Sequence, residues 1–203
     1  MKQKKKLAVL VSGSGSNLQA IIDAIKTHLL ENTEISIVIS NKKNAYALIR
    51  AENEKINNLY LNPKDFNTSL DFEKKLVETI SNYGVDLIVL AGFTKILSES
   101  FVNSFPNKII NIHPALLPLF GGKDMYGERV HEAVLNSNVK ESGCTVHFVT
   151  SEVDGGPIIS QRKVPVLKGD TAETLSKRIL EQEHKLIVES VNMVLFEKMP
   201  MSL

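Results

Sequence analysis

The sequence has little cysteine, no tryptophan, no excess of charge of either sign and no long apolar run. Cys144 is its only cysteine, which excludes an internal disulfide framework and leaves too few thiolates for a metal cluster. Lysine and arginine number 24 against 23 aspartates and glutamates, and this near-neutral balance argues against a dedicated nucleic-acid-binding protein. The first apolar run ends at Ser12, far short of the ~18 residues of a membrane span.

The composition is that of an ordinary globular protein. Of 203 residues, 43% are hydrophobic and 23% are charged, and this length suits one domain. We therefore expect a single domain over residues 1–203, with neither nucleic acid nor a membrane as partner. Because no signal peptide is visible and a disulfide framework is excluded, we expect a cytoplasmic protein. Both a monomer and a homodimer remain open.

Strand and helix patterns alternate along the chain, which predicts an α/β fold. The expected strands are Lys6–Ser12, Glu34–Ser40, Asp86–Ala91, Lys108–His113, Gly143–Val149 and Pro157–Val166. The expected helices are Asn17–His28, Ala45–Glu54, Leu70–Tyr83, Ser98–Phe105, Gly127–Ser137 and a long one over Ala172–Leu195, which a capping box of Asp170 and Glu173 opens. The alternation predicts a doubly wound, mostly parallel sheet flanked by helices, and the short loop Thr150–Gly156 makes the last strand pair antiparallel.

The first strand ends in a serine- and glycine-rich turn, residues 12–17, that leads directly into a helix. Glycine allows a tight turn, and the free N–H groups of a helix N-terminus bind anions such as phosphate. Neither the dinucleotide fingerprint nor the P-loop fits, because Leu18 stands where the first needs glycine and Ser16-Asn17-Leu18 replaces the Gly-Lys-Ser/Thr of the second. A capped glycine turn without a ligand remains the alternative.

A second cluster lies where the fourth expected strand ends. Asn111 and His113 are two residues apart and therefore share one face of the strand, with Ile110 and Ile112 on the other. Ligands of doubly wound sheets bind beyond the carboxyl ends of the strands, so this pair indicates a functional site. If the fold brings Asp154 beside His113, the carboxylate favours the imidazolium and raises the pKa of the histidine. An amide and a cation would then face a developing oxyanion together.

The sequence shows no protein nucleophile and no metal site. Its five histidines lack metal-ligand spacing, no Gly-x-Ser-x-Gly elbow is present, and Cys144 lies in an apolar strand pattern. We therefore expect direct transfer between two bound small molecules.

These motifs resemble a known family. Residues 12–21, 90–93 and 96–98, 111–114, 145–149 and 154–157 resemble, in order, those of the phosphoribosylglycinamide formyltransferases, over nearly the whole chain. The resemblance implies transfer of a formyl group from 10-formyltetrahydrofolate, a co-substrate, to the amine of 5-phosphoribosylglycinamide in purine synthesis, without a metal. It also implies a phosphate-binding half over residues 1–105 and a folate-binding, catalytic half over residues 106–203.

The resemblance further implies a role for each matching residue. His113 is the acid that steadies the tetrahedral intermediate, Asn111 donates to the formyl oxygen, and Asp154 raises the pKa of His113. The substrate phosphate is held by the backbone of Gly15, Ser16 and Asn17, and the ribose by Glu183. The folate is held by two segments: Thr94, Lys95, Ile96 and Leu97, and Thr150, Ser151, Glu152, Val153 and Asp154.

Some positions depart from the family pattern. Ser69 stands where many members have an arginine that contacts the folate, Leu180 replaces a polar residue, and residues 119–127 resemble a variant branch. The glycine-rich ends of this last segment favour a mobile flap over the site. A formyltetrahydrofolate hydrolase or a methionyl-tRNA formyltransferase shares Asn111, His113 and Asp154, although each normally carries a further domain that we do not expect here. A non-catalytic ligand-binding module is the alternative from another class.

Overall fold

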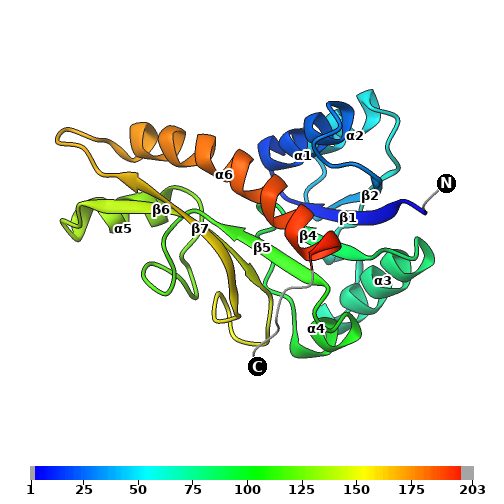
Figure 1. Cartoon of the computed structure of the whole chain (residues 1–203). Coiled ribbons are helices and arrows are strands. Elements are labelled where there is room, and N and C mark those ends of the chain that lie inside the picture. The colour runs from blue at the N-terminus through cyan, green and yellow to red at the C-terminus, as the bar shows by residue number, and fades with distance from the viewer. Residues whose placement is uncertain (1–2, 198–203) are drawn as a thin grey trace.

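A computed structural model describes residues 3–197, which form one seven-stranded sheet flanked by helices (Figure 1). The strands are β1 (Lys5–Val11), β2 (Thr33–Ser40), β3 (Asn58–Tyr60), β4 (Leu87–Leu90), β5 (Ile109–His113), β6 (Glu141–Phe148) and β7 (Ile158–Pro165). The helices are α1 (Ser16–Lys26), α2 (Tyr46–Asn53), α3 (Ser69–Asn82), α4 (Glu99–Ser104), α5 (Glu128–Asn136) and α6 (Ala172–Phe196), with a 3-10 turn over Pro63–Asp65.

The order of the strands is β3-β2-β1-β4-β5-β6-β7. Strands β1 to β5 pair in parallel, whereas β5 with β6 and β6 with β7 are antiparallel, so the prediction of a mixed, mostly parallel sheet is confirmed. The edge strand β3 was not expected from the sequence. It is only three residues long, and an Asn begins it, so no apolar run marks it.

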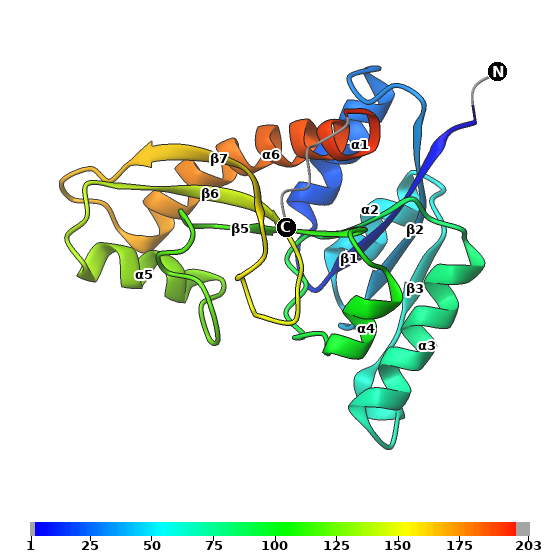
Figure 2. The same cartoon turned by 60° about the horizontal axis from the view of Figure 1, so that its bottom comes forward.

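Alternate residues of the central strands enter two separate cores. Leu7, Val9 and Val11 of β1 join a core to which α1, α2, α5 and α6 contribute, and Ala8 and Leu10 join the core formed with α3 and α4. Figure 2 shows α1 and α6 on one side of the sheet and α3 and α4 on the other. Burial on both faces explains why these strands read as continuous apolar runs.

Helix α6 begins differently from the expectation. Its capping box joins Thr171 and Thr174, so the prediction of Asp170 with Glu173 is wrong. Asp170 instead accepts two hydrogen bonds from the Arg178 guanidinium, at 2.8 Å each, and these hold the pKa of its carboxyl below the usual range. The Thr171 hydroxyl takes the cap because it lies one residue nearer to the first free N–H groups of the helix.

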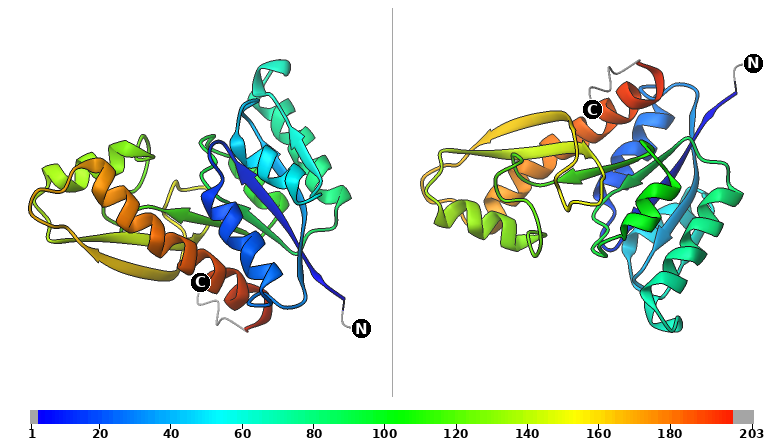
Figure 3. Two further views of the ribbon diagram at one scale, coloured as in Figure 1. Left: turned by 90° about the horizontal axis from the view of Figure 1, so that it is seen from above. Right: turned by 90° about the horizontal axis from the view of Figure 1, so that it is seen from below.

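Helix α6 is 25 residues long and crosses one face of the sheet beside α1 (Figure 3). This contact brings Glu183, near the middle of α6, beside Asn17, just after the turn that follows β1. Among residues 3–197, no helix has both the length and the apolar character that a membrane crossing requires.

Candidate functional site

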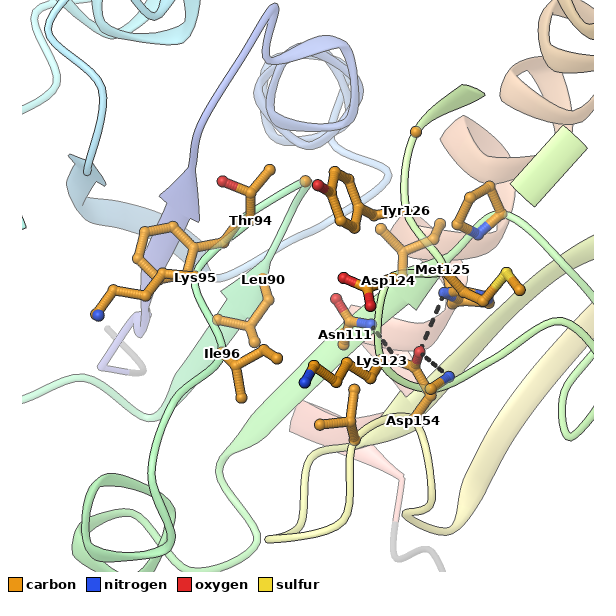
Figure 4. A pocket seen from close by; sticks show the side chains of 18 of the residues that line it. Leu90, Thr94, Lys95, Ile96, Asn111, Lys123, Asp124, Met125, Tyr126 and Asp154 are labelled. Carbon is orange, nitrogen blue, oxygen red and sulfur yellow. Dashed lines mark hydrogen bonds and ion pairs between the residues drawn. The ribbon is translucent and has the colours of Figure 1, made fainter. Parts of the chain in front are cut away.

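An open cavity of about 1220 Å³ lies at the carboxyl ends of β4 and β5 (Figure 4). This is the position that the doubly wound sheet predicts for a ligand. Most of the residues singled out in the sequence line it, namely Asn17, Thr94, Lys95, Ile96, Leu97, Asn111, His113, Thr150, Ser151, Glu152, Val153, Asp154 and Glu183. Gly15 and Ser16 do not line it, although they directly precede Asn17.

Strand β5 presents Asn111 and His113 to the cavity. Ile110 and Ile112, on the opposite face, pack into the core that α6 covers, which holds the strand in this orientation. His113 is only 4% exposed, and Pro114 follows it at once and cannot extend the ladder as a donor. The period-two prediction that places the two polar side chains together is confirmed.

The Asp154 carboxylate lies between two histidines, His113 and His147. Its Oδ2 is 3.5 Å from Nδ1 of His113 and accepts a 3.0 Å hydrogen bond from the Gly122 N–H. Its Oδ1 is 3.4 Å from Nε2 of His147 and accepts a 3.4 Å hydrogen bond from Nδ2 of Asn111. One carboxylate therefore contacts both polar side chains of β5, so the condition set in the sequence analysis, that Asp154 lies beside His113, is met.

His147 was missed from the sequence as part of this cluster. It lies on β6 directly opposite Asn111, whose Nδ2 is 3.1 Å from its Nε2, and it is 2% exposed. Its Nδ1 donates to the Phe148 carbonyl at 2.8 Å, because a carbonyl oxygen only accepts. The available signal was its polar side chain between the apolar Val146 and Phe148, next to the strand that carries Asn111.

The net pKa of His113 differs from the expectation, although the contribution of Asp154 has the expected sign. Burial lowers the pKa of His113 below its ordinary value, and the opposing effect of the Asp154 charge is smaller. Hydrogen bonding and charge from His147 and His113 nevertheless outweigh burial at Asp154 and keep the pKa of its carboxyl lowered. The histidine also has a fixed tautomer: Nε2 donates to the Phe120 carbonyl at 2.8 Å, so Nδ1 is the nitrogen that gains or loses the proton beside Asp154.

The glycine-rich turn after β1 is tightly held by α2. Gly15 has φ +71°, and a Cβ there would lie 2.6 Å from Cβ of Ala47, so this position requires glycine. Nε of Arg50 donates to the Ser14 carbonyl at 2.8 Å, and the Ala47 N–H donates to the Gly13 carbonyl at 3.2 Å. The turn is thus preformed at the N-terminus of α1, with free N–H groups that could face an anion.

Asn17 and Glu183 close this end of the cavity. Nδ2 of Asn17 donates to a Glu183 oxygen at 2.7 Å, although 166 positions separate the two residues. Burial raises the pKa of the Glu183 carboxyl, and the hydrogen bond from Asn17 only partly opposes this. Oδ1 of Asn17 is buried without a partner, so a hydrogen-bond acceptor is left available beside the carboxyl group.

Comparisons with known proteins agree with the motifs found in the sequence. Residues 5–191 match the formyl transferase family. The chain belongs to this family. The chloroplastic phosphoribosylglycinamide formyltransferase of Arabidopsis thaliana is 42% identical over 97% of the chain and 67% of its own length. The human trifunctional purine biosynthetic protein adenosine-3 is 42% identical over 95% of the chain, which spans only 18% of that longer protein.

A solved structure agrees with this assignment. Glycinamide ribonucleotide transformylase 1 from Symbiobacterium toebii superposes with a TM-score of 0.89 and 41% sequence identity, over 95% of this chain and 88% of that one. The family resemblance read from the motifs and the fold class are thus confirmed.

In this formyltransferase chain, two loops face each other across the remaining part of the cavity. Figure 4 shows Thr94, Lys95 and Ile96 on one side and Lys123 and Asp154 on the other. The variant segment 119–127 supplies part of the wall through residues 122–127. The two departures from the family pattern lie elsewhere: Ser69 is exposed at the first turn of α3, and Leu180 is half-buried on α6, and neither lines the cavity.

Proposed function

We propose that the chain transfers the formyl group of 10-formyltetrahydrofolate to the amine of 5-phosphoribosylglycinamide, giving formylglycinamide ribonucleotide and tetrahydrofolate in purine synthesis. The observation that carries the proposal is the joining of Asn111, His113 and Asp154 in one cavity whose far end is closed by Asn17 and Glu183. Reacting group and phosphoribosyl group then have separate places. Membership of the family and the names of its relatives support the same reaction.

The acceptor amine is the nucleophile, so the protein needs none of its own. The amine nitrogen attacks the formyl carbon, and negative charge develops on the formyl oxygen. The Asn111 amide and protonated His113 stabilise that oxygen, Asp154 stabilises the imidazolium, and the carbon–nitrogen bond to the folate then breaks. The amine loses one proton, and the departing folate nitrogen takes one up with His113 as acid.

At its Nε2, His113 meets the Phe120 carbonyl. For Nε2–H to donate to the substrate, the substrate oxygen has to take the place of that carbonyl, so segment 119–127 shifts when the site is filled. Such a shift agrees with the hypothesis that residues 119–127 are a mobile flap. Within this segment Phe120 and Asp124 have positive φ angles, 56° and 68°.

The phosphoribosyl group occupies the turn end of the cavity. Backbone N–H groups of Gly15, Ser16 and Asn17 hold the phosphate at the start of α1, where the helix dipole favours an anion. Glu183 accepts hydrogen bonds from the ribose hydroxyls, in exchange for the one that it accepts from Asn17. Asn17 then turns its amide toward the substrate.

The formyl-folate occupies the other end. Backbone groups of segment 94–97 and of the loop 150–154 hold its ring system, and the half-buried Lys95 lies beside it. No metal takes part in these steps. The two small molecules are the proposed partners, and the cytoplasm is the proposed compartment. Residues 1–105 form the proposed phosphate-binding half, and residues 106–203 the proposed catalytic half.

Absorbance-monitored release of folate product from 10-formyl-5,8-dideazafolate, with and without 5-phosphoribosylglycinamide, tests the proposal. We expect turnover that requires the acceptor and that is lost in His113→Ala. Turnover without acceptor would identify a hydrolase, and turnover that requires another acceptor would identify a different formyltransferase. Ligand binding without turnover, unchanged in His113→Ala, would identify a binding module.

A further inference from the structure

Residues 92–98, between β4 and α4, form neither helix nor strand, yet residues 92–97 provide one wall of the cavity. Such a segment keeps its shape only if side chains from other elements hold it. Near its start, the Thr94 N–H donates to Oγ of Ser12 at 2.9 Å. At its end, Ser98 is held by a carboxylate from α3.

That carboxylate is Glu73, which is 3% exposed and lies on the α3 face that otherwise carries Phe72, Leu76 and Ile80. Its Oε1 accepts the Ser98 N–H at 3.2 Å, and its Oε2 accepts the Ser98 hydroxyl. A buried carboxylate is costly unless hydrogen bonds compensate it, so both oxygens have a defined task here.

The Ser98 hydroxyl also begins α4. It accepts a 3.3 Å hydrogen bond from the Phe101 N–H as the N-cap of the helix. Because its proton is directed to Glu73, its lone pairs remain for the helix. One carboxylate thus orients both the last residue of the wall segment and the first turn of α4.

Helix α3 contacts the wall segment at a second point. Nζ of Lys95 lies 5.3 Å from the centroid of the Phe72 ring, directly before Glu73 in the chain. Leu97, next to Ser98, is 9% exposed and packs into the core formed with α3 and α4. Lys95 and Leu97, which line the cavity, are therefore held from α3, which itself does not line it.

We propose that Glu73 is a positioning residue for the formyl donor: through Ser98 it fixes the backbone of residues 95–97 against which the folate binds. The inference rests on the proposed function, because it needs the folate at this wall. Glu73 does not line the cavity itself, so it acts only through the segment.

Two variants and a matched control separate positioning from general stability. Glu73→Gln keeps the shape and one acceptor for the Ser98 N–H, but its amide nitrogen cannot accept the Ser98 hydroxyl. Ser98→Ala removes the hydroxyl from the other side. Glu78→Gln on the same helix is the control, since Glu78 is exposed and pairs only with Lys75 at the surface.

The experiment combines three readouts on the full chain: amide hydrogen exchange over residues 93–98, the Kd of 10-formyl-5,8-dideazafolate, and steady-state kinetics for both substrates. In Glu73→Gln and Ser98→Ala we expect faster exchange in the segment. We also expect a Kd and a donor KM about five- to tenfold higher, as loss of one charge-assisted hydrogen bond implies. The KM for the phosphoribosyl acceptor stays within about twofold, and Glu78→Gln resembles the wild type.

Unchanged donor affinity in both variants, with wild-type binding intact, would overturn the positioning role and leave the proposed function standing. A lower thermal midpoint with equal changes in both KM values would also overturn it, because that pattern is merely structural. Failure of the wild-type protein to bind the folate analogue would overturn the proposed function, and the role of Glu73 with it.

Discussion

Replacing Asp154 by asparagine removes a charge without changing the size of the side chain, and we expect it to slow transfer by roughly 10²–10³-fold. The carboxylate lies 3.5 Å from Nδ1 of His113, and both side chains are largely buried. At an effective dielectric constant of 20, a charge pair at about this distance interacts by about 4 kcal/mol. Asparagine supplies none of this attraction to the imidazolium. Burial disfavours the charged histidine in the wild type and in the variant, so the transition state loses only part of this interaction energy.

The pH profile is the decisive assay. Since Asp154 raises the pKa of His113 against the effect of burial, its removal makes the histidine lose its proton at lower pH. The alkaline limb of the kcat profile then moves to lower pH in Asp154→Asn, and acidic buffer restores part of the rate. Asp124→Asn is the control, because Asp124 lines the same cavity on the variant segment. A slow Asp154→Asn enzyme whose alkaline limb coincides with that of the wild type would refute this account of the carboxylate.

Two further predictions concern the turn and the stability of the protein. Gly15→Ala forces a side chain into a left-handed conformation and against Ala47. We therefore expect the free energy of unfolding in urea to fall by at least about 1–2 kcal/mol, and the KM for the phosphoribosyl substrate to rise. Gly13→Ala, with free space at its Cβ, is the control, and equal effects of the two substitutions would contradict the packing argument. Burial, and then the charge of His113, lowers the pKa of His131. The unfolded chain therefore binds the proton first, and the free energy of unfolding falls as pH drops below about 6.5. His131→Gln lessens this fall in urea titrations at pH 7.5 and 5.5, whereas the exposed His28→Gln leaves it unchanged.

The fold was predictable because its signals are local. Continuous apolar runs and helical periodicity place most elements within two residues of their observed bounds, and the short loop after β6 predicts the antiparallel pair. Strand β3 was missed because a strand of three residues is too short to show an apolar run or a period-two pattern. At α6 the carboxylate of Asp170 binds Arg178, about two turns later, and the hydroxyl of Thr171 caps the helix instead.

The site was only partly predictable. Asn111 and His113 share a face because of strand geometry alone, but the proximity of Asp154 depends on how a distant loop returns to β5. The net pKa of His113 depends on burial, which is a property of the finished fold and not of the neighbouring residues in the sequence. His147 and Glu73 were missed for the same reason: each lies in an apolar pattern, and its polar contacts come from another element.

The hydrogen bond between Asn17 and Glu183 has a consequence for synthesis of the protein. A ribosome makes the turn after β1 well before α6, since 166 positions separate Asn17 from Glu183. Until α6 has emerged, the first core lacks Leu175, Ile179 and Leu186, and the proposed place for the phosphoribosyl group lacks the carboxyl group of Glu183. The nascent chain therefore completes the proposed acceptor site only after α6 has emerged, however early the turn after β1 has formed.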